Sequence, residues 1–307
     1  MRKSCIGILL ILATALLIMP VSVKTANYPP AVMFASLLNN MEYRSDGSFD
    51  LGNQMQAVFL PAGTNGYVLL KKADGAGLCK ISFTMEAIKP PFTLFSFLEK
   101  TNLKTGEHEY AYIKLEEPGN YLLDFYSGDT LFYKFPFSIS KVSSSDPYAG
   151  GDIYLIDGAW SNWGYLFYSD ANPENSITWK MWLNNKGHGE KDIKVRIEVV
   201  RDKDKKLVCT SRGDVTYSVL PKWNRFEFDL ISPMEGTSGG AYFKAKDLLA
   251  VDGAYTLTVK VDDKVYGVWK FSIAGNKLVL TGQADRGKAD PITFIEGGKD
   301  AFWYKKS

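Results

Sequence analysis

Apolar and polar residues alternate in short runs along most of the chain. In residues 254–261 the odd positions hold Tyr, Leu or Val and the even positions hold Ala, Thr or Lys. A period of two is the pattern of a β-strand with one buried face. Turn-forming residues separate the runs, as at Ser127-Gly128-Asp129 and at Asp262-Asp263. The pattern predicts an all-β protein made of antiparallel strands.

One stretch of this pattern occurs twice. Residues 119–139 (GNYLLDFYSGDTLFYKFPFSI) and residues 253–273 (GAYTLTVKVDDKVYGVWKFSI) align without a gap and share seven identities. Each copy consists of a strand-like run, a turn and a second strand-like run, which predicts a β-hairpin. Self-similarity of this kind indicates two copies of one structural unit.

The entry to each hairpin adds a more specific motif. Leu115 precedes a turn with Gly and then Tyr121, and Leu249 precedes a similar turn and then Tyr255. This motif resembles the tyrosine corner of immunoglobulin-like and fibronectin-like β-sandwiches, in which the Tyr hydroxyl bonds to backbone a few residues upstream. The Cys…Trp…Cys spacing of antibody domains is missing. The resemblance therefore implies architecture only: two tandem immunoglobulin-like β-sandwich domains of an exported, bacterial-type protein.

Further strand-like runs fall on both sides of a segment rich in Ser and Gly. They cover residues 57–60, 67–71, 78–85, 92–98 and 110–115, and then residues 153–156, 177–183, 193–201, 207–210 and 225–230, with one helical turn at 244–250. We expect domain 1 at residues 27–142, the linker at 143–151 and domain 2 at 152–275. The tail, residues 276–307, either adds an edge strand or packs back onto a domain.

The N-terminal segment predicts export. Arg2 and Lys3 precede an uncharged apolar run over residues 6–19, the two regions of a secretory signal. The run is short for a membrane-spanning helix, which needs about 20 residues. Residues 1–26 are interpreted as a signal peptide. An uncleaved anchor is the alternative, because Lys24 stands where a small residue is preferred for cleavage after Ala26. The expected location is periplasmic or extracellular, with membrane attachment only if the segment is not cleaved.

Composition supports globular domains and argues against some partners. Hydrophobic residues make up 46% of the chain, and 36 Lys and Arg nearly balance 34 Asp and Glu. Without a strongly basic balance, we expect no nucleic-acid partner. Export would permit disulfides. Cys79 and Cys209 nevertheless fall in different expected domains, which favours two separate buried thiols over a bridge.

Residues for catalysis are scarce. The two histidines, His108 and His188, lie in turn-like sequences, and neither an HExxH motif nor a phosphate-binding loop occurs. Residues 236–240 (GTSGG) resemble the sequence around a protease serine, but Thr237 replaces the usual Asp and no histidine base is indicated for Ser238. We therefore expect no catalytic residue, no metal site and no cofactor, so the protein is interpreted as not being an enzyme.

Tryptophans gather at one place, with four of them at positions 160–182. Alternation in residues 177–183 puts Trp182 on the face opposite Trp179. If that strand pairs with residues 193–201, Trp182 lies near Arg196, where a cation could stack on the ring. The candidate binding residues are Trp160, Trp163, Trp182, Arg196, Trp223 and Arg225.

Exposed Trp and Arg side chains are common where proteins bind one another. An exposed indole face also suits the apolar face of a sugar ring. A third interpretation is that Trp160 and Trp163 cap a sandwich while Trp182 is covered by the other domain or the tail. The sequence predicts an exported, non-enzymatic interaction or structural protein with an envelope or extracellular protein partner. The alternative is a carbohydrate-binding accessory protein that uses exposed Trp of domain 2.

Overall fold

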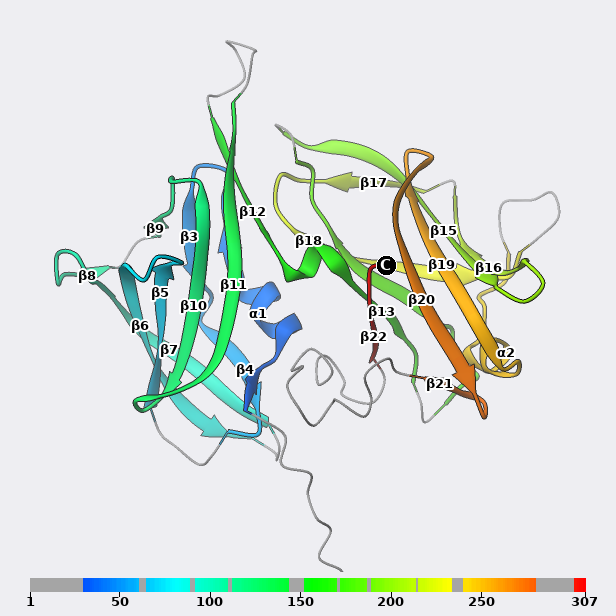
Figure 1. Ribbon diagram of the computed structural model, residues 1–307, viewed down its shortest axis with the longest axis horizontal. Coiled ribbons are helices and arrows are strands. Elements are labelled where there is room, and N and C mark those ends of the chain that lie inside the picture. Colours follow the sequence, from blue (N-terminus) through cyan, green and yellow to red (C-terminus); the bar gives the residue numbers. More distant parts are fainter. Residues whose placement is uncertain are drawn as a thin grey trace, which may run out of the picture.

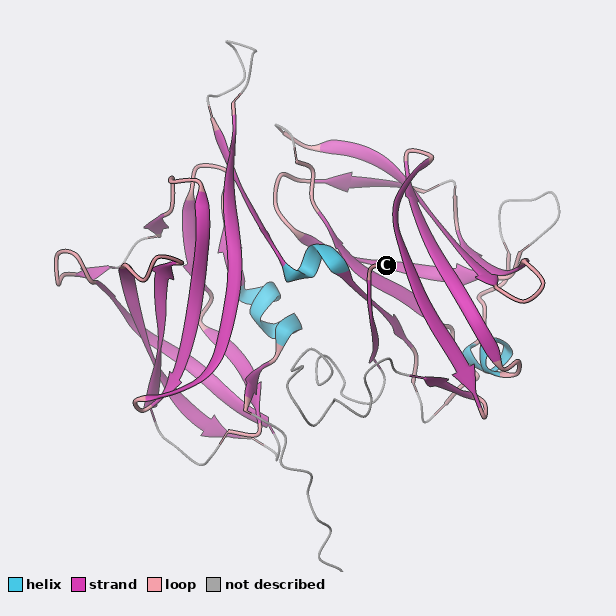
Figure 2. Cartoon of the chain, viewed as in Figure 1, coloured by secondary structure: helices cyan, strands magenta, loops and turns pink. Residues whose placement is uncertain are grey.

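The computed structural model shows two β bodies side by side, with few helices (Figures 1 and 2). It describes residues 30–60, 65–88, 92–109, 112–143, 152–169, 172–186, 189–213, 215–233, 240–279 and 301–307. The expected signal segment, residues 1–26, and most of the expected linker lie outside the described residues. Within the described residues, no helix has the length and apolar character needed to cross a bilayer.

The first body is built around one curled antiparallel sheet. From edge to edge its strands are β1 (Ala31–Val32), β4 (Gln54–Val58), β7 (Phe92–Asn102), β6 (Gly77–Ala87), β5 (Asn65–Lys72), β10 (Gly119–Ser127), β11 (Thr130–Val142) and β12 (Ile153–Gly158), with β8 (His108–Glu109) beside β7. Helix α1 (Phe34–Asn40) and a small sheet of β2 (Met41–Tyr43), β3 (Ser48–Leu51) and β9 (Ile113–Lys114) complete the body.

The second body is one antiparallel sheet that is nearly barrel-shaped. In order its strands are β21 (Lys277–Val279), β20 (Lys264–Ala274), β19 (Gly253–Val261), β15 (Lys191–Arg201), β16 (Lys206–Ser211), β18 (Asn224–Ile231), β14 (Thr178–Leu183), β13 (Trp163–Phe167) and β22 (Ala301–Lys305), with β17 (Thr216–Val219) beside β15. The end of the chain after β22 approaches β20 near the other edge of the sheet. There Lys306 forms a β-bridge with Trp269, and the Ser307 amide donates to the Val268 carbonyl at 2.8 Å.

Seven strands of each sheet follow the same order. They are β1-β4-β7-β6-β5-β10-β11 in the first body and β13-β14-β18-β16-β15-β19-β20 in the second. Numbered along the chain within each set, both orders are 1-2-5-4-3-6-7. The correspondence of the two bodies therefore extends beyond the hairpin repeat seen in the sequence.

The repeated hairpins match residue for residue. Gly119 pairs with Ile139 and Gly253 with Ile273, and both hairpins carry a register shift six residues after the Gly. The second hairpin turns through Asp262 and Asp263, both at positive φ, as a two-residue turn of this kind requires. The predicted hairpins are confirmed.

Each hairpin also begins with the bond that its motif predicts. The Tyr121 hydroxyl donates to the Glu117 carbonyl oxygen at 2.7 Å, and the Tyr255 hydroxyl donates to the Val251 carbonyl oxygen at 2.6 Å. Both acceptors lie four residues upstream in the chain. The predicted helical turn before the second corner is α2 (Ala245–Leu249).

The sheets are more continuous than two separate sandwich layers would be. In the first body β6 pairs with β7 along nine residue pairs, so the sheet curls around its core without dividing. The equivalent junction in the second body, β16 with β18, has only two residue pairs. The all-β prediction with two bodies is confirmed at this coarser level.

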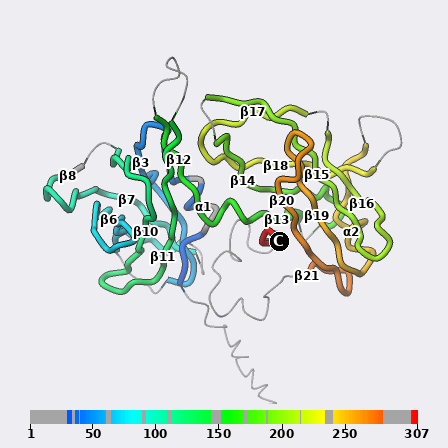
Figure 3. The backbone as a smooth tube through the Cα atoms, turned by 45° about the horizontal axis from the view of Figure 1, so that its top comes forward, coloured from blue at the N-terminus to red at the C-terminus, as the bar shows by residue number. Residues whose placement is uncertain are grey.

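Strand β12 differs from its predicted place. From its sequence it was expected to open the second domain, but it pairs with β11 along six residues from Phe137 to Val142. β12 lies along the edge of β11 opposite β10, beside the last six residues of β11. The chain then passes into the second body through β12 and the short helix η1 (Ala159–Asn162), as Figures 1 and 3 show.

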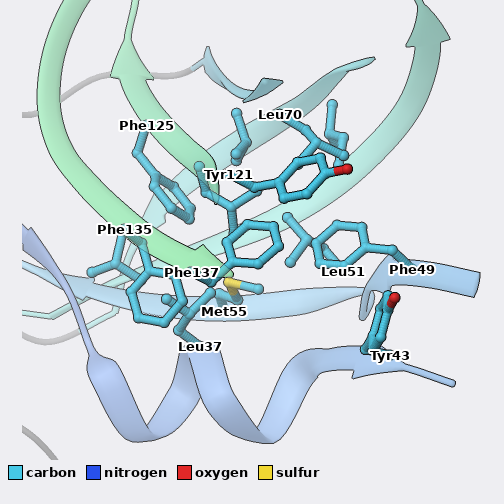
Figure 4. Packing of buried hydrophobic residues seen from close by; sticks show 14 of the residues in the cluster. Leu37, Tyr43, Phe49, Leu51, Met55, Leu70, Tyr121, Phe125, Phe135 and Phe137 are labelled. Carbon is cyan, nitrogen blue, oxygen red and sulfur yellow. The ribbon is translucent and has the colours of Figure 1, made fainter. Parts of the chain in front are cut away.

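The core of the first body lies between the curled sheet, the small sheet and α1. Figure 4 shows Leu37 of α1 pointing toward Phe135 and Phe137 of β11, and Tyr43 of β2 beside Phe49 of β3. Phe137 stacks on Phe49 and on Tyr121, with ring centroids 5.9 Å and 5.5 Å apart. Cys79 and Cys209 are thiols, each buried in a different body.

Candidate functional site

Aromatic side chains join the two bodies. Trp160 of η1 stacks on Phe135 of β11 with ring centroids 5.5 Å apart. Trp160, Tyr165 and Trp182 belong to the same continuous buried cluster as the core of the first body. Trp160 is 0% exposed and Trp182 is 2% exposed. Trp160 and Trp182 therefore lie at the junction between the bodies and not on an open sheet face.

The C-terminal strand covers Trp182. Trp303 of β22 stacks on Tyr165, with ring centroids 4.3 Å apart, and on Trp182, with centroids 5.8 Å apart. β22 reaches this place because it pairs with β13 over five residue pairs. Of the interpretations that the sequence left open, these contacts agree with the one in which the tail covers Trp182.

A cleft of about 370 Å³ opens beside this junction. Ligand-binding cavities usually begin at about 300 Å³. Its walls come from segments far apart in the sequence. The first body contributes Leu38, Asn40, Met41, Glu42, Tyr43, Gly52 and Ile156. Helix η1 and the second body contribute Trp160, Trp182, Lys222, Trp223, Asn224 and Arg225.

Trp223 is the cleft aromatic with the most accessible surface, because it is half-buried whereas the other two indoles are buried. Its indole N–H donates to the Ile156 carbonyl at 2.5 Å, and its ring meets Trp160 edge-on at 6.0 Å. These two contacts hold the side chain against β12 and η1. Trp223 is therefore a fixed aromatic wall of the cleft.

Strand pairing brings Arg225 to the same place. Arg225 is directly opposite Trp182 in the β14–β18 ladder. Its guanidinium lies 3.2 Å from a carboxylate oxygen of Glu227, which also accepts from the nearly buried Lys180 at 2.9 Å. Glu227 thus provides one negative charge to two cations, Arg225 and Lys180, on this side of the cleft.

On the facing side, Glu42 is the only carboxylate among the lining residues. Arg44 donates to one of its oxygens at 3.0 Å, and the Tyr112 hydroxyl donates to the other at 3.0 Å. The hydrogen bond from Arg44, with help from Tyr112 and from the charge of Lys222, lowers the pKa of Glu42. Glu42 is therefore a fixed, ionised acceptor at neutral pH.

Several polar groups of the cleft have bonding capacity left. Among the described residues no carboxylate pairs with Lys222, and the carboxamide oxygens of Asn40 and Asn224 receive no hydrogen bond. The buried indole N–H of Trp160 has no partner within the described protein. A buried donor without a partner costs about 1–3 kcal/mol. The Tyr43 hydroxyl, in contrast, already has a partner within the protein, because it donates to the Leu115 carbonyl at 2.9 Å. Burial raises the pKa of this hydroxyl.

The structure brings together four of the six candidate residues, namely Trp160, Trp182, Trp223 and Arg225. Trp163 is half-buried against the same cluster but does not line the cleft. Arg196 lies elsewhere: β16 and β18 separate its strand from β14, and its guanidinium pairs with Glu198 at 3.1 Å. The two strands therefore do not pair, and the condition under which Arg196 would lie near Trp182 is not met.

Sequence reasoning missed the wall from the first body. Asn40 and Glu42 lie in a stretch, residues 31–51, where no element was expected. Lys222 and Asn224 are the sequence neighbours of the candidate residue Trp223, but nothing in the sequence showed which residues they face. The only early signal was the pair Trp223 and Arg225 on the face opposite the core of their strand.

A second cavity, about 460 Å³ in volume, lies within the first body between β3 and β7. Its charged residues are largely paired: Lys100 contacts Asp50 at 2.6 Å, and His108 lies 3.6 Å from Glu99. Its walls include Phe97 but no tryptophan. The cleft between the bodies is the better candidate, because three tryptophans line it and because its Lys222 pairs with no carboxylate among the described residues.

In the described part of the chain, no group of three potential metal ligands occurs. Ser238 and His188 lie outside the described residues. Comparison of the chain with protein-family models, with curated proteins and with solved structures finds no match. The functional argument therefore depends on the chemistry of the cleft.

Proposed function

We propose that this protein is an exported, non-enzymatic binding protein whose partner or ligand occupies the cleft between the two bodies. The observation that carries the proposal is the composition of the cleft. Half-buried Trp223, unpaired Lys222 and fixed Glu42 face one space, although they come from different bodies. Concave sites with aromatic walls and a few placed polar groups are the usual form of a binding site.

We also propose that both bodies are immunoglobulin-like units of the fibronectin type. The shared order 1-2-5-4-3-6-7 supports this, because such a unit has strands 1, 2 and 5 in one layer and strands 4, 3, 6 and 7 in the other. The two corner bonds of Tyr121 and Tyr255 support it as well. Units of this kind serve many binding roles, so the fold alone names no ligand.

Export is supported by the basic and apolar N-terminal residues. N-terminal sequencing of the protein recovered from its producing cells tests this part. A chain that begins near residue 27 in the extracytoplasmic fraction is expected. A chain that begins at Met1 in the cytoplasm would contradict export.

Photo-crosslinking tests the binding site without assuming a ligand class. A benzophenone amino acid in place of Asn224 puts the probe in the cleft, and the same residue in place of Val265, which is 62% exposed and outside the cleft, is the control. Irradiation of producing cells is expected to give a discrete adduct from position 224 alone. Adducts from neither position, or equally from both, would refute the cleft as the binding site.

A further inference from the structure

We propose that the cleft binds a polyhydroxylated ring, such as the end of a neutral oligosaccharide, with Trp223 as its apolar wall. This inference rests on the proposed binding function and names the ligand class. It depends on three features of the cleft: its aromatic surface, its mixture of donors and acceptors, and its modest charge.

The aromatic surface suits the C–H face of a sugar ring. An aromatic face is electron-rich and attracts the weakly positive hydrogens that a pyranose presents on one side. Trp223 retains accessible surface in the cleft, and its bonds to Ile156 and Trp160 prevent it from folding away. A ring held this way loses little side-chain freedom when a ligand binds.

The polar groups suit hydroxyls better than other ligand groups. A hydroxyl both donates and accepts, so it needs donors and acceptors side by side. The cleft offers the acceptor Glu42 and the carboxamides of Asn40 and Asn224, together with the ammonium of Lys222. An anion would use only the donors and would leave Glu42 facing a like charge. A cation would meet Lys222 and Arg225.

The charge of the cleft is modestly positive. The lining residues include one carboxylate and two cations, and one of the cations, Arg225, shares the carboxylate of Glu227 with Lys180. Glu42 is compensated by Arg44. A cationic ligand is disfavoured by such a site, whereas Lys222 can donate either to a hydroxyl or to an anionic group, and the titration below distinguishes the two.

Titration of the full chain with defined sugars tests the proposal. The probes are glucose, N-acetylglucosamine, galacturonate, cellohexaose and chitohexaose, with binding followed by Trp fluorescence and by calorimetry. A saturable response to at least one neutral sugar is expected. Asn224→Ala and Lys222→Ala are each expected to weaken it by about tenfold, the effect of one lost hydrogen bond.

The matched control is Lys203→Ala, an exposed lysine at the turn between β15 and β16. It is expected to bind as the wild type does. Each variant must melt as the wild type does, so a loss of binding cannot come from unfolding. Equal weakening by Lys203→Ala would overturn the placement of the sugar in the cleft.

The remaining outcomes separate the two proposals. If no sugar binds but position 224 crosslinks to a peptide or protein, the sugar inference is overturned and the binding function stands. If no sugar binds and position 224 gives no adduct, both fail. A response to galacturonate alone would overturn the neutral ligand and assign the site to an acidic group at Lys222.

Discussion

Trp303 tests whether the C-terminal strand belongs to the core. The proposed change is Trp303→Ala. The side chain is 4% exposed and stacks on Tyr165 and Trp182. Truncation of a buried Trp costs about 3–5 kcal/mol, a range that includes the lost aromatic contacts. We therefore expect the free energy of unfolding to fall by about 4 kcal/mol in a urea titration followed by circular dichroism.

The position of Trp303 near the chain end sets an upper limit on this loss. If β22 detaches from β13 before the body unfolds, the cost cannot exceed the free energy that docks the strand. A chain that lacks residues 301–307 measures that limit directly. Trp303→Ala should destabilise the protein by no more than this deletion does.

Lys305→Ala is the control, because Lys305 is exposed on the same strand. A surface change of this kind usually stays within about 0.5 kcal/mol. If Trp303→Ala also stayed within that range, the strand would contribute nothing to the core, and the argument that β22 covers Trp182 would be refuted.

Three further predictions concern the two bodies. Tyr121→Phe and Tyr255→Phe should each cost about 1 kcal/mol of unfolding free energy through one lost hydrogen bond, and melting curves equal to the wild type would contradict the corner bonds. Burial raises the pKa of the Cys209 thiol, so at pH 8 a thiol reagent should modify it only at the rate at which the second body opens; rapid labelling in the native state would disprove its burial. Hydrogen bonds from Ser48 lower the pKa of Asp46 to about 2 from an ordinary value of 3.8. Because the folded pKa is the lower one, this carboxylate stabilises the fold at neutral pH, and the contribution is lost between about pH 4 and pH 2. Acid titration of Asp46→Asn should show a smaller loss of stability in that window, and an unchanged loss would argue against the Asp46 contact.

Local patterns were sufficient for the hairpins and corners. Alternation in residues 253–261 identified β19, and the two Asp residues at its end identified the turn. The tyrosine corner could be predicted because its donor and acceptor lie only four residues apart. Such features depend on near neighbours in the chain, so the sequence contains what is needed to recognise them.

The cleft could be predicted only in part, because its walls meet through contacts between distant segments. Trp223 and Arg225 share a strand, and alternation placed both on the same face. The residues opposite them, Asn40 and Glu42, are about 180 positions away in the printed sequence and carry no repeating pattern. A period of two tells which side chains share a face, but it does not tell what covers that face.

The sequence by itself determined an all-β chain with a duplicated hairpin, and the structure extends the likeness to seven strands of each body. Tertiary structure alone decided that β12 joins the first sheet and that β22 closes over Trp182. The physical reason is the same in both cases. A free sheet edge exposes unpaired backbone groups that another strand can pair with, and which strand reaches that edge depends on contacts between distant segments that local sequence does not show.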